Sequence, residues 1–223
     1  MIREEKVSLT KSRMNLLIFR PEEYAHLPLL IYLHGAGERG TKIDHLTRHG
    51  VPLLIENGRE IPAVVLCPQC PGDFIWNNIT PELYQIITDV MREYDIDRDR
   101  VVITGSSMGG YGTWETAICF PELFAAAAPV SGGGVTFRAA KLANVPVRAY
   151  HGDRDDAVEY ENSVLMVNAV NRKGGAAELV TLAGMGHNDA INYAYRETDL
   201  IEWLLSQRKT DFSPVVEPYS QYY

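Results

Sequence analysis

Residues 101–117 read Val101-Val102-Ile103-Thr104-Gly105-Ser106-Ser107-Met108-Gly109-Gly110-Tyr111-Gly112-Thr113-Trp114-Glu115-Thr116-Ala117. Four β-branched residues open this segment, as in a buried strand, and a helix-like stretch closes it. Between them, a G-x-S-x-G pattern places Ser107 at a sharp turn, with Gly105 and Gly109 where the strand and helix backbones crowd each other. We predict that Ser107 is a nucleophile and that its neighbour Ser106 is structural. A plain Gly/Ser connection is the alternative, which the flanking strand and helix disfavour.

Apolar runs recur along the rest of the chain with helical stretches between them, which is typical of a parallel sheet covered on both faces. Strands are predicted at residues 16–19, 29–33, 63–66, 101–104, 124–130, 145–150 and 177–182. Helices are predicted after Thr80, after Ser107, near 160–172 and over 190–206. We therefore predict an α/β fold with a mostly parallel, twisted sheet of about eight strands. Residues 1–209 form a single domain in this interpretation, and residues 210–223 form a C-terminal tail.

Composition narrows the class of protein further. The 223 residues are 46% hydrophobic and 22% charged, as in an ordinary globular domain. The net charge of −8 repels phosphate backbones and anionic lipid, so nucleic acid and membrane partners are not expected. The first six residues do not resemble a secretory signal, which predicts a cytoplasmic protein. The tail contains aromatic side chains that would suit docking on a neighbouring subunit, so a homo-oligomer is an alternative to a monomer.

Three cysteines are too few and too odd in number for a disulfide framework. Cys67 and Cys70 have the C-x-x-C spacing of a redox pair or half a zinc site, but no second pair follows at zinc-site spacing. We interpret these residues as a strand end that enters a Pro-rich loop. No metal and no cofactor are expected.

A serine nucleophile needs a base and a carboxylate that orients the base, and both follow predicted strands. His187 lies in a Gly-rich loop after residues 177–182 and is the predicted base. The loop after residues 145–150 offers Asp153, Asp155 and Asp156, of which we favour Asp155 as the acid. His151, at the start of that loop, is expected to make hydrogen bonds within it.

A small-residue loop after residues 29–33 reads His34-Gly35-Ala36-Gly37-Glu38-Arg39-Gly40. Its backbone amides can approach a developing oxyanion, and we assign the amides of Ala36 and Met108 to this role. Phosphate binding is the alternative for such a loop. The Lys-Ser/Thr of a Walker motif and a three-glycine dinucleotide fingerprint are both missing, so acyl chemistry is favoured.

The chain resembles the α/β-hydrolase superfamily, within it the compact esterases and predicted peptidases related to the polyhydroxybutyrate-depolymerase, feruloyl-esterase and phospholipase/carboxylesterase groups. The resemblance rests on residues 33–40, 105–114, 151–155 and 186–187, and extends in collinear order to about Trp203. It implies a single α/β-hydrolase domain, with Ser107 as nucleophile, His187 as base, Asp155 as acid and Ala36 as the second oxyanion donor. Asp156 departs from the pattern, because a Pro or another residue is common there.

The resemblance implies a serine carboxylester hydrolase that acts on short-chain acyl esters or on esters of polar or carbohydrate substrates. A serine peptidase or thioesterase shares the chemistry, and a noncatalytic binding protein shares the scaffold. No long insertion precedes residue 145, which predicts little or no lid. Trp76 and Tyr111 are predicted to line the substrate site, with ordinary core packing as the alternative for both.

Overall fold

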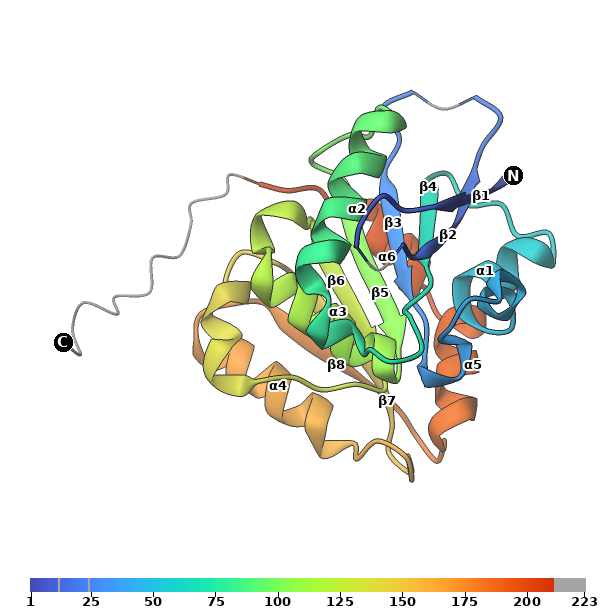
Figure 1. Ribbon diagram of the computed structural model, residues 1–223. Coiled ribbons are helices and arrows are strands. Elements are labelled where there is room, and N and C mark those ends of the chain that lie inside the picture. Colours follow the sequence, from blue (N-terminus) through green and yellow to red (C-terminus); the bar gives the residue numbers. More distant parts are fainter. Residues whose placement is uncertain (12, 24, 211–223) are drawn as a thin grey trace.

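The computed structural model describes residues 1–11, 13–23 and 25–210 (Figure 1). Among these residues, eight strands form one sheet in the order β1-β2-β4-β3-β5-β6-β7-β8. The strands are β1 Ile2–Val7, β2 Asn15–Arg20, β3 Leu29–Leu33, β4 Val64–Pro68, β5 Val101–Ser106, β6 Ala126–Val130, β7 Val147–Gly152 and β8 Ala177–Leu182. Strands β3 to β8 run parallel, whereas β2 pairs antiparallel with both β1 and β4. The predicted α/β-hydrolase fold is confirmed, and the predicted tail lies outside the described residues from 211 onward.

Helices cover both faces of the sheet (Figure 1). They are α1 Gly50–Glu56, α2 Thr80–Glu93, α3 Met108–Cys119, α4 Glu161–Arg172, α5 His187–Glu197 and α6 Leu200–Ser206. One hydrophobic cluster joins α2, α3 and α4 to the sheet, and a second joins α1, α5 and α6 to the opposite face. Short 3-10 helices fill the connections: η1 Ala36–Glu38, η2 Ile43–Thr47, η3 Trp76–Asn78, η4 Pro121–Leu123 and η5 Thr136–Leu142.

The apolar spacing predicts α2 correctly, because Leu83, Ile86, Ile87 and Val90 are all buried on its inner side. The central strands are uninterrupted apolar runs: every residue of β3 and β4 is buried. This is what parallel strands with helices on both faces require. Among the described residues, none of the helices is both long and apolar enough to cross a bilayer.

Several predicted elements differ from those in the structure. The predicted helix over 190–206 is two helices, because Thr198 adopts an extended backbone and its hydroxyl accepts a hydrogen bond from the amide of Leu200. β7 begins at Val147 and continues to Gly152, and β6 begins only at Ala126. The edge strand β1 has no counterpart in the predicted set, because its charged residues hide the apolar pattern.

Candidate active site

Ser107 sits on a tight turn between β5 and α3. Its φ of 56° and ψ of −117° lie outside the regions that most residues adopt, so the turn holds a strained backbone at this position. The amide of Ser107 donates to the carbonyl of Val130 on β6 at 3.0 Å, and its carbonyl accepts from the amide of Tyr111 at 3.1 Å. The turn is therefore anchored on the strand side and on the helix side.

The two glycines that flank this turn are required by close approach of backbone to backbone. A Cβ on Gly105 would lie 2.5 Å from the carbonyl oxygen of Gly109, and a Cβ on Gly109 would lie 1.9 Å from the carbonyl oxygen of Leu33. No real Cβ comes this near to a carbonyl oxygen, and neither obstructing atom belongs to a movable side chain. The glycines let α3 begin directly over the ends of β3 and β5.

We expect Gly109→Ala to lower the free energy of unfolding by about 3 kcal/mol or more, because the clash with Leu33 can be relieved only by moving backbone. Gly72→Ala is the matched control, since a Cβ there would have no neighbour within 4 Å. Urea unfolding of both variants measures the difference. Equal stabilities would contradict the close approach described for the turn.

His187 and Asp155 form a hydrogen-bonded pair. The Nδ1 atom of His187 lies 2.7 Å from Oδ2 of Asp155, whose side chain is fully buried. The other carboxylate oxygen accepts from the amides of Ala157 at 3.0 Å and Val158 at 2.8 Å. Burial by itself raises the pKa of Asp155, but the Val158 amide, the His187 ring and the Ala157 amide together hold that pKa below its usual value. Asp155 is thus kept as a charged acceptor against Nδ1 of His187.

The two neighbouring candidates for the acid point elsewhere. Asp153 and Asp156 are both exposed, and Asp153 accepts a hydrogen bond from the amide of Gly184 at 2.6 Å. Of the three carboxylates in the loop, the structure brings Asp155 to His187.

A second histidine shares the same carboxylate. His151 is fully buried, and its Nε2 atom lies 2.9 Å from the carbonyl oxygen of Val158 and 3.2 Å from Oδ2 of Asp155. Both neighbours are acceptors, so Nε2 must carry a hydrogen. Burial lowers the pKa of His151, which favours the neutral ring with Nδ1 facing the hydroxyl of Ser163 at 2.8 Å. As predicted, His151 makes hydrogen bonds within its loop, and it also supports the Asp155 side chain.

Ser107 and His187 line one cavity of about 250 Å³ at the carboxyl ends of the parallel strands, where open α/β sheets bind ligands. The wall also contains residues from the loop after β3 and from the first turns of α5: Gly35, Ala36, Gly37, Glu38, His49, Asn188, Ile191 and Asn192, together with Ser106. Of these, the sequence did not indicate Glu38, His49, Asn188, Ile191 or Asn192. The last three enter the wall because α5 begins at His187, earlier than predicted.

The predicted oxyanion donors each begin a helix. Ala36 is the first residue of η1 and lines the cavity, while Met108 is the first residue of α3 and directly follows Ser107, although it is not among the lining residues. Amides in the first turn of a helix have no partner within that helix, so they are available to a negative charge. Their function as oxyanion donors stays a prediction.

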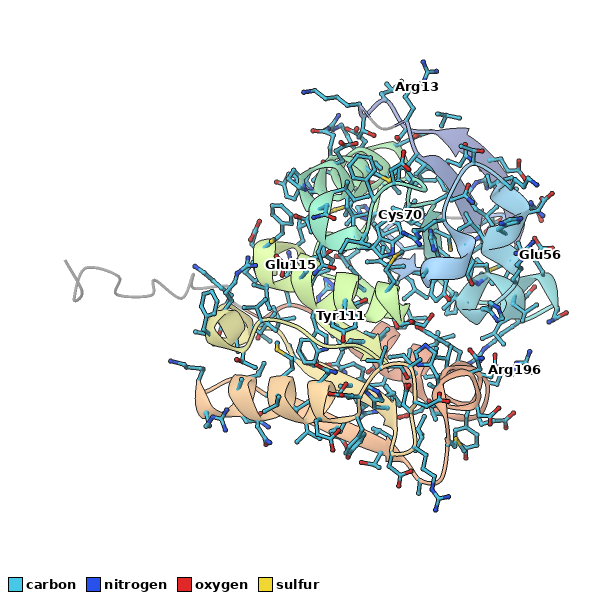
Figure 2. The ribbon with its side chains drawn as sticks, turned by 60° about the horizontal axis from the view of Figure 1, so that its bottom comes forward. Arg13, Glu56, Cys70, Tyr111, Glu115 and Arg196 are labelled. Atoms are coloured by element: carbon cyan, nitrogen blue, oxygen red, sulfur yellow. The ribbon has the colours of Figure 1, made fainter. Side chains whose placement is uncertain are left out.

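The prediction that Trp76 lines the site is wrong. Trp76 is fully buried, its Nε1 donates to the carbonyl of His34 at 3.0 Å, and its Cβ lies where a Cβ on Gly112 would clash at 2.5 Å. The indole thus holds the start of the loop after β3 through this hydrogen bond. Tyr111 lies half-buried on the first turn of α3 (Figure 2), beside Gly133 and outside the set of residues that line the cavity. Its contact with substrate stays a prediction.

Cys67 and Cys70 are buried free thiols. Burial raises the pKa of the Cys70 thiol, labelled in Figure 2, to about 12, and it raises the pKa of Cys67 further still, so both remain protonated and unreactive at neutral pH. The amide of Cys70 donates to Nε2 of His34 at 2.9 Å. Within residues 1–11, 13–23 and 25–210, no group of three or more His, Cys, Asp or Glu side chains could hold a metal ion.

We expect His34 to make the protein less stable in acid. Burial, with a smaller effect from the charge of Arg39, lowers its pKa to about 4. Protonation would also break the hydrogen bond that Nε2 accepts from Cys70. Between pH 6.5 and pH 4 the unfolded chain takes up a proton on His34 that the folded chain does not, so stability falls as pH falls, by on the order of 3 kcal/mol.

Urea unfolding at several pH values between 7 and 4 tests this expectation. The slope of stability against pH should flatten in His34→Gln and should be unchanged in a His26→Gln control, whose side chain is 79% exposed. Comparison with the variant separates His34 from Glu38 and His151, whose pKa values are also shifted. An identical slope in His34→Gln would contradict the assignment.

The chain is similar in sequence and in fold to known esterases. Over 151 residues the chain is 32% identical to a bifunctional acetylxylan esterase/xylanase of Neocallimastix patriciarum, and the match covers 65% of this chain and 22% of that protein. A crystal structure of a thermostable esterase superposes with a TM-score of 0.80 at 29% identity, and covers 93% of this chain and 63% of that chain. A feruloyl esterase module from Clostridium thermocellum complexed with sinapinate has a TM-score of 0.71 at 18% identity, over 95% of this chain and 90% of that one, which shows the shared fold.

The chain thus spans about a fifth of the length of the curated relative and less than two thirds of the thermostable esterase. Residues 73–193 match the phospholipase/carboxylesterase family over more than half of the 223 residues. This segment includes Ser107, Asp155 and His187. The chain belongs to the phospholipase/carboxylesterase family of the α/β-hydrolase fold.

Proposed function

We propose that this protein is a serine carboxylester hydrolase in which Ser107, His187 and Asp155 act together. One observation carries the proposal: the buried carboxylate of Asp155 lies 2.7 Å from Nδ1 of His187, and that histidine lines the same cavity as the strained serine at the β5–α3 turn. A hydrogen on Nδ1 that donates to Asp155 leaves Nε2 free to accept a proton.

The reaction takes place in two halves. Ser107 Oγ attacks the acyl carbon while Nε2 of His187 takes the hydroxyl proton, and the carbonyl oxygen becomes an oxyanion held by the amides of Ala36 and Met108. When the tetrahedral species collapses, the bond to the alcohol breaks and His187 gives its proton to the leaving oxygen. Water then attacks the acyl-serine with the same histidine as base, which releases the acid and restores the free serine.

Short acyl esters of polar or carbohydrate alcohols are the substrates that we propose. The cavity of about 250 Å³ is small, and its wall contains the polar side chains of Glu38, His49, Asn188 and Asn192, with Ile191 as an apolar member. The acetylxylan esterase relative is named for acetate esters of a carbohydrate, which supports the class. A long lipid chain would need a longer apolar wall.

Peptidase and thioesterase activities are the alternatives within the same chemistry, and a noncatalytic binding protein is the alternative outside it. Incubation with a fluorophosphonate probe, followed by peptide mapping, should give a covalent adduct on Ser107. We expect the highest rates on acetate esters. The comparison uses the acetyl, butyryl and octanoyl esters of p-nitrophenol, acetylated xylose, and a matched anilide and thioester. Absence of the adduct in folded protein would favour the binding protein.

A further inference from the structure

Glu38 places a buried carboxylate in the wall of the cavity, close to the nucleophile. Its side chain is only 7% exposed. A Cβ on Gly35 would lie 3.4 Å from Oε2 of Glu38 and 3.8 Å from Cβ of Ser107, so the two side chains flank Gly35. Both residues line the cavity. A group bound at Ser107 is therefore within reach of this carboxylate.

Among the described residues, no side chain donates a hydrogen bond to this carboxylate. The nearest ring nitrogens are Nδ1 of His34 at 3.8 Å and Nε2 of His49 at 3.9 Å, both beyond hydrogen-bond distance. Nδ1 of His34 is occupied, since it lies 2.6 Å from the carbonyl oxygen of Gly35. Burial raises the pKa of Glu38, and the nearby His49, a hydrogen bond from the amide of Glu38 itself and the charge of Arg48 partly oppose this rise.

The loop that carries Glu38 is held in place by a fully buried amide. Gln69 donates from Nε2 to the carbonyls of Glu38 at 2.9 Å and Lys42 at 2.8 Å, and its Oε1 accepts from Nδ2 of Asn15 at 2.9 Å. The carboxylate is thus fixed at the cavity wall. Within the described part of the chain, the one donor to this carboxylate is the amide of Glu38 itself, so its oxygens can still accept from a group in the cavity, and a largely buried charged acceptor binds such a donor favourably.

The cavity that Glu38 lines also has to hold the alcohol part of an ester, because His187 lines it too. His187 must give its proton to the leaving oxygen, so the alcohol lies on the side of Ser107 where His187 begins α5. Asn188 and Asn192, from the first turns of that helix, line the same cavity as Glu38. Neutral amides both donate and accept, which suits hydroxyl groups.

We propose that Glu38 accepts a hydrogen bond from a hydroxyl of the alcohol part of the substrate, which makes this wall of the cavity a subsite for polyhydroxylated leaving groups. The inference rests on the proposed ester hydrolysis and assigns its selectivity for the alcohol to one residue. Glu38 selects among alcohol groups, whereas Ser107 and His187 act on every ester alike.

The test compares two acetate esters of three-carbon alcohols that differ in their hydroxyl groups, glycerol 1-monoacetate and propyl acetate. The wild-type protein should have the higher kcat/KM for the glycerol ester. Glu38→Ala should reduce the ratio of the two kcat/KM values by about tenfold or more, the range for a hydrogen bond to a charged group, and should leave propyl acetate within about threefold of wild type. Glu38→Gln keeps a carbonyl oxygen at nearly the same place and should reduce the ratio less.

Glu23→Gln is the matched control, because Glu23 is exposed in the loop before β3, at the opposite end of the strands from the cavity. An unchanged ratio in Glu38→Ala, or an equal loss on both esters, would overturn the subsite while leaving the esterase intact. If Glu38→Ala does not fold, Glu38→Gln decides by the same ratio.

A larger loss on acetylcholine than on the glycerol ester in Glu38→Gln would instead assign the wall to cationic alcohols. A folded wild-type protein that hydrolyses neither ester would overturn the proposed function and the subsite together.

Discussion

Ser107→Ala is expected to lower kcat for p-nitrophenyl acetate by about 10⁴-fold to 10⁶-fold, which leaves only the rate that the remaining site supplies. The reason is that the hydroxyl of Ser107 is the proposed attacking group, at the turn where β5 ends and α3 begins. The backbone of Ser107 has φ of 56°, and this lifts its side chain into the cavity that His187 also lines. Without Oγ, no acyl-enzyme can form.

The adjacent serine provides the control. Ser106 also lines the cavity, but it is nearly fully buried and its Oγ lies 3.3 Å from Oη of Tyr32. Ser106→Ala should therefore lose less than about tenfold in rate and on the order of 1 kcal/mol in stability, the cost of one buried hydrogen bond. Both variants are measured by initial rates and by urea unfolding. A Ser107→Ala protein that folds and keeps wild-type turnover would contradict the nucleophile.

Asp155→Asn is expected to lower kcat by about 10⁴-fold while the fold stays intact. The amides of Ala157 and Val158 both donate to Oδ1, so the carbonyl oxygen of the new side chain must take that position. Its NH₂ group then faces His187, where Asp155 now accepts. The ring must turn its unprotonated nitrogen toward the amide, which places the hydrogen on Nε2 and removes the base that Ser107 needs.

The same NH₂ group would also face Nε2 of His151, which carries a hydrogen of its own. Two donors then meet, so Asp155→Asn should also lower stability by about 1–3 kcal/mol. Asp156→Asn, an exposed change one residue away, is the control for both measurements and should be near wild type. Equal rates for the two variants would show that Asp155 does not orient His187.

The turn at Ser107 was predictable because its causes are local. A β-branched strand, two glycines that remove side chains at a crowded crossing and a following helix all lie within one short segment. His187 and Asp155 were predictable from their places after strands, because parallel strands bring their carboxyl ends to one edge of the sheet. The central strands were predictable because burial on both faces makes them continuous apolar runs.

The features that could not be predicted from the sequence depend on contacts between distant segments. Trp76 is an aromatic residue near the expected site. Only the structure shows that its indole donates a hydrogen bond to the carbonyl of His34 and that its side chain packs against Gly112. Glu38 stands in the small-residue loop after β3, where the neighbouring residues give no sign of burial, yet the chain around it buries the carboxylate. His49 lies in a polar segment of the sequence and its side chain is exposed, but it also lines the cavity.

Two imidazole rings lie beside Oδ2 of Asp155, and this limits how His151, Asp155 and His187 can be replaced over evolutionary time. Replacement of either histidine leaves the buried carboxylate with one fewer N–H group beside Oδ2, since His187 supplies the one at 2.7 Å and His151 the one at 3.2 Å. Substitutions at His151, Asp155 and His187 are therefore expected to be correlated with one another, even though His151 does not line the cavity.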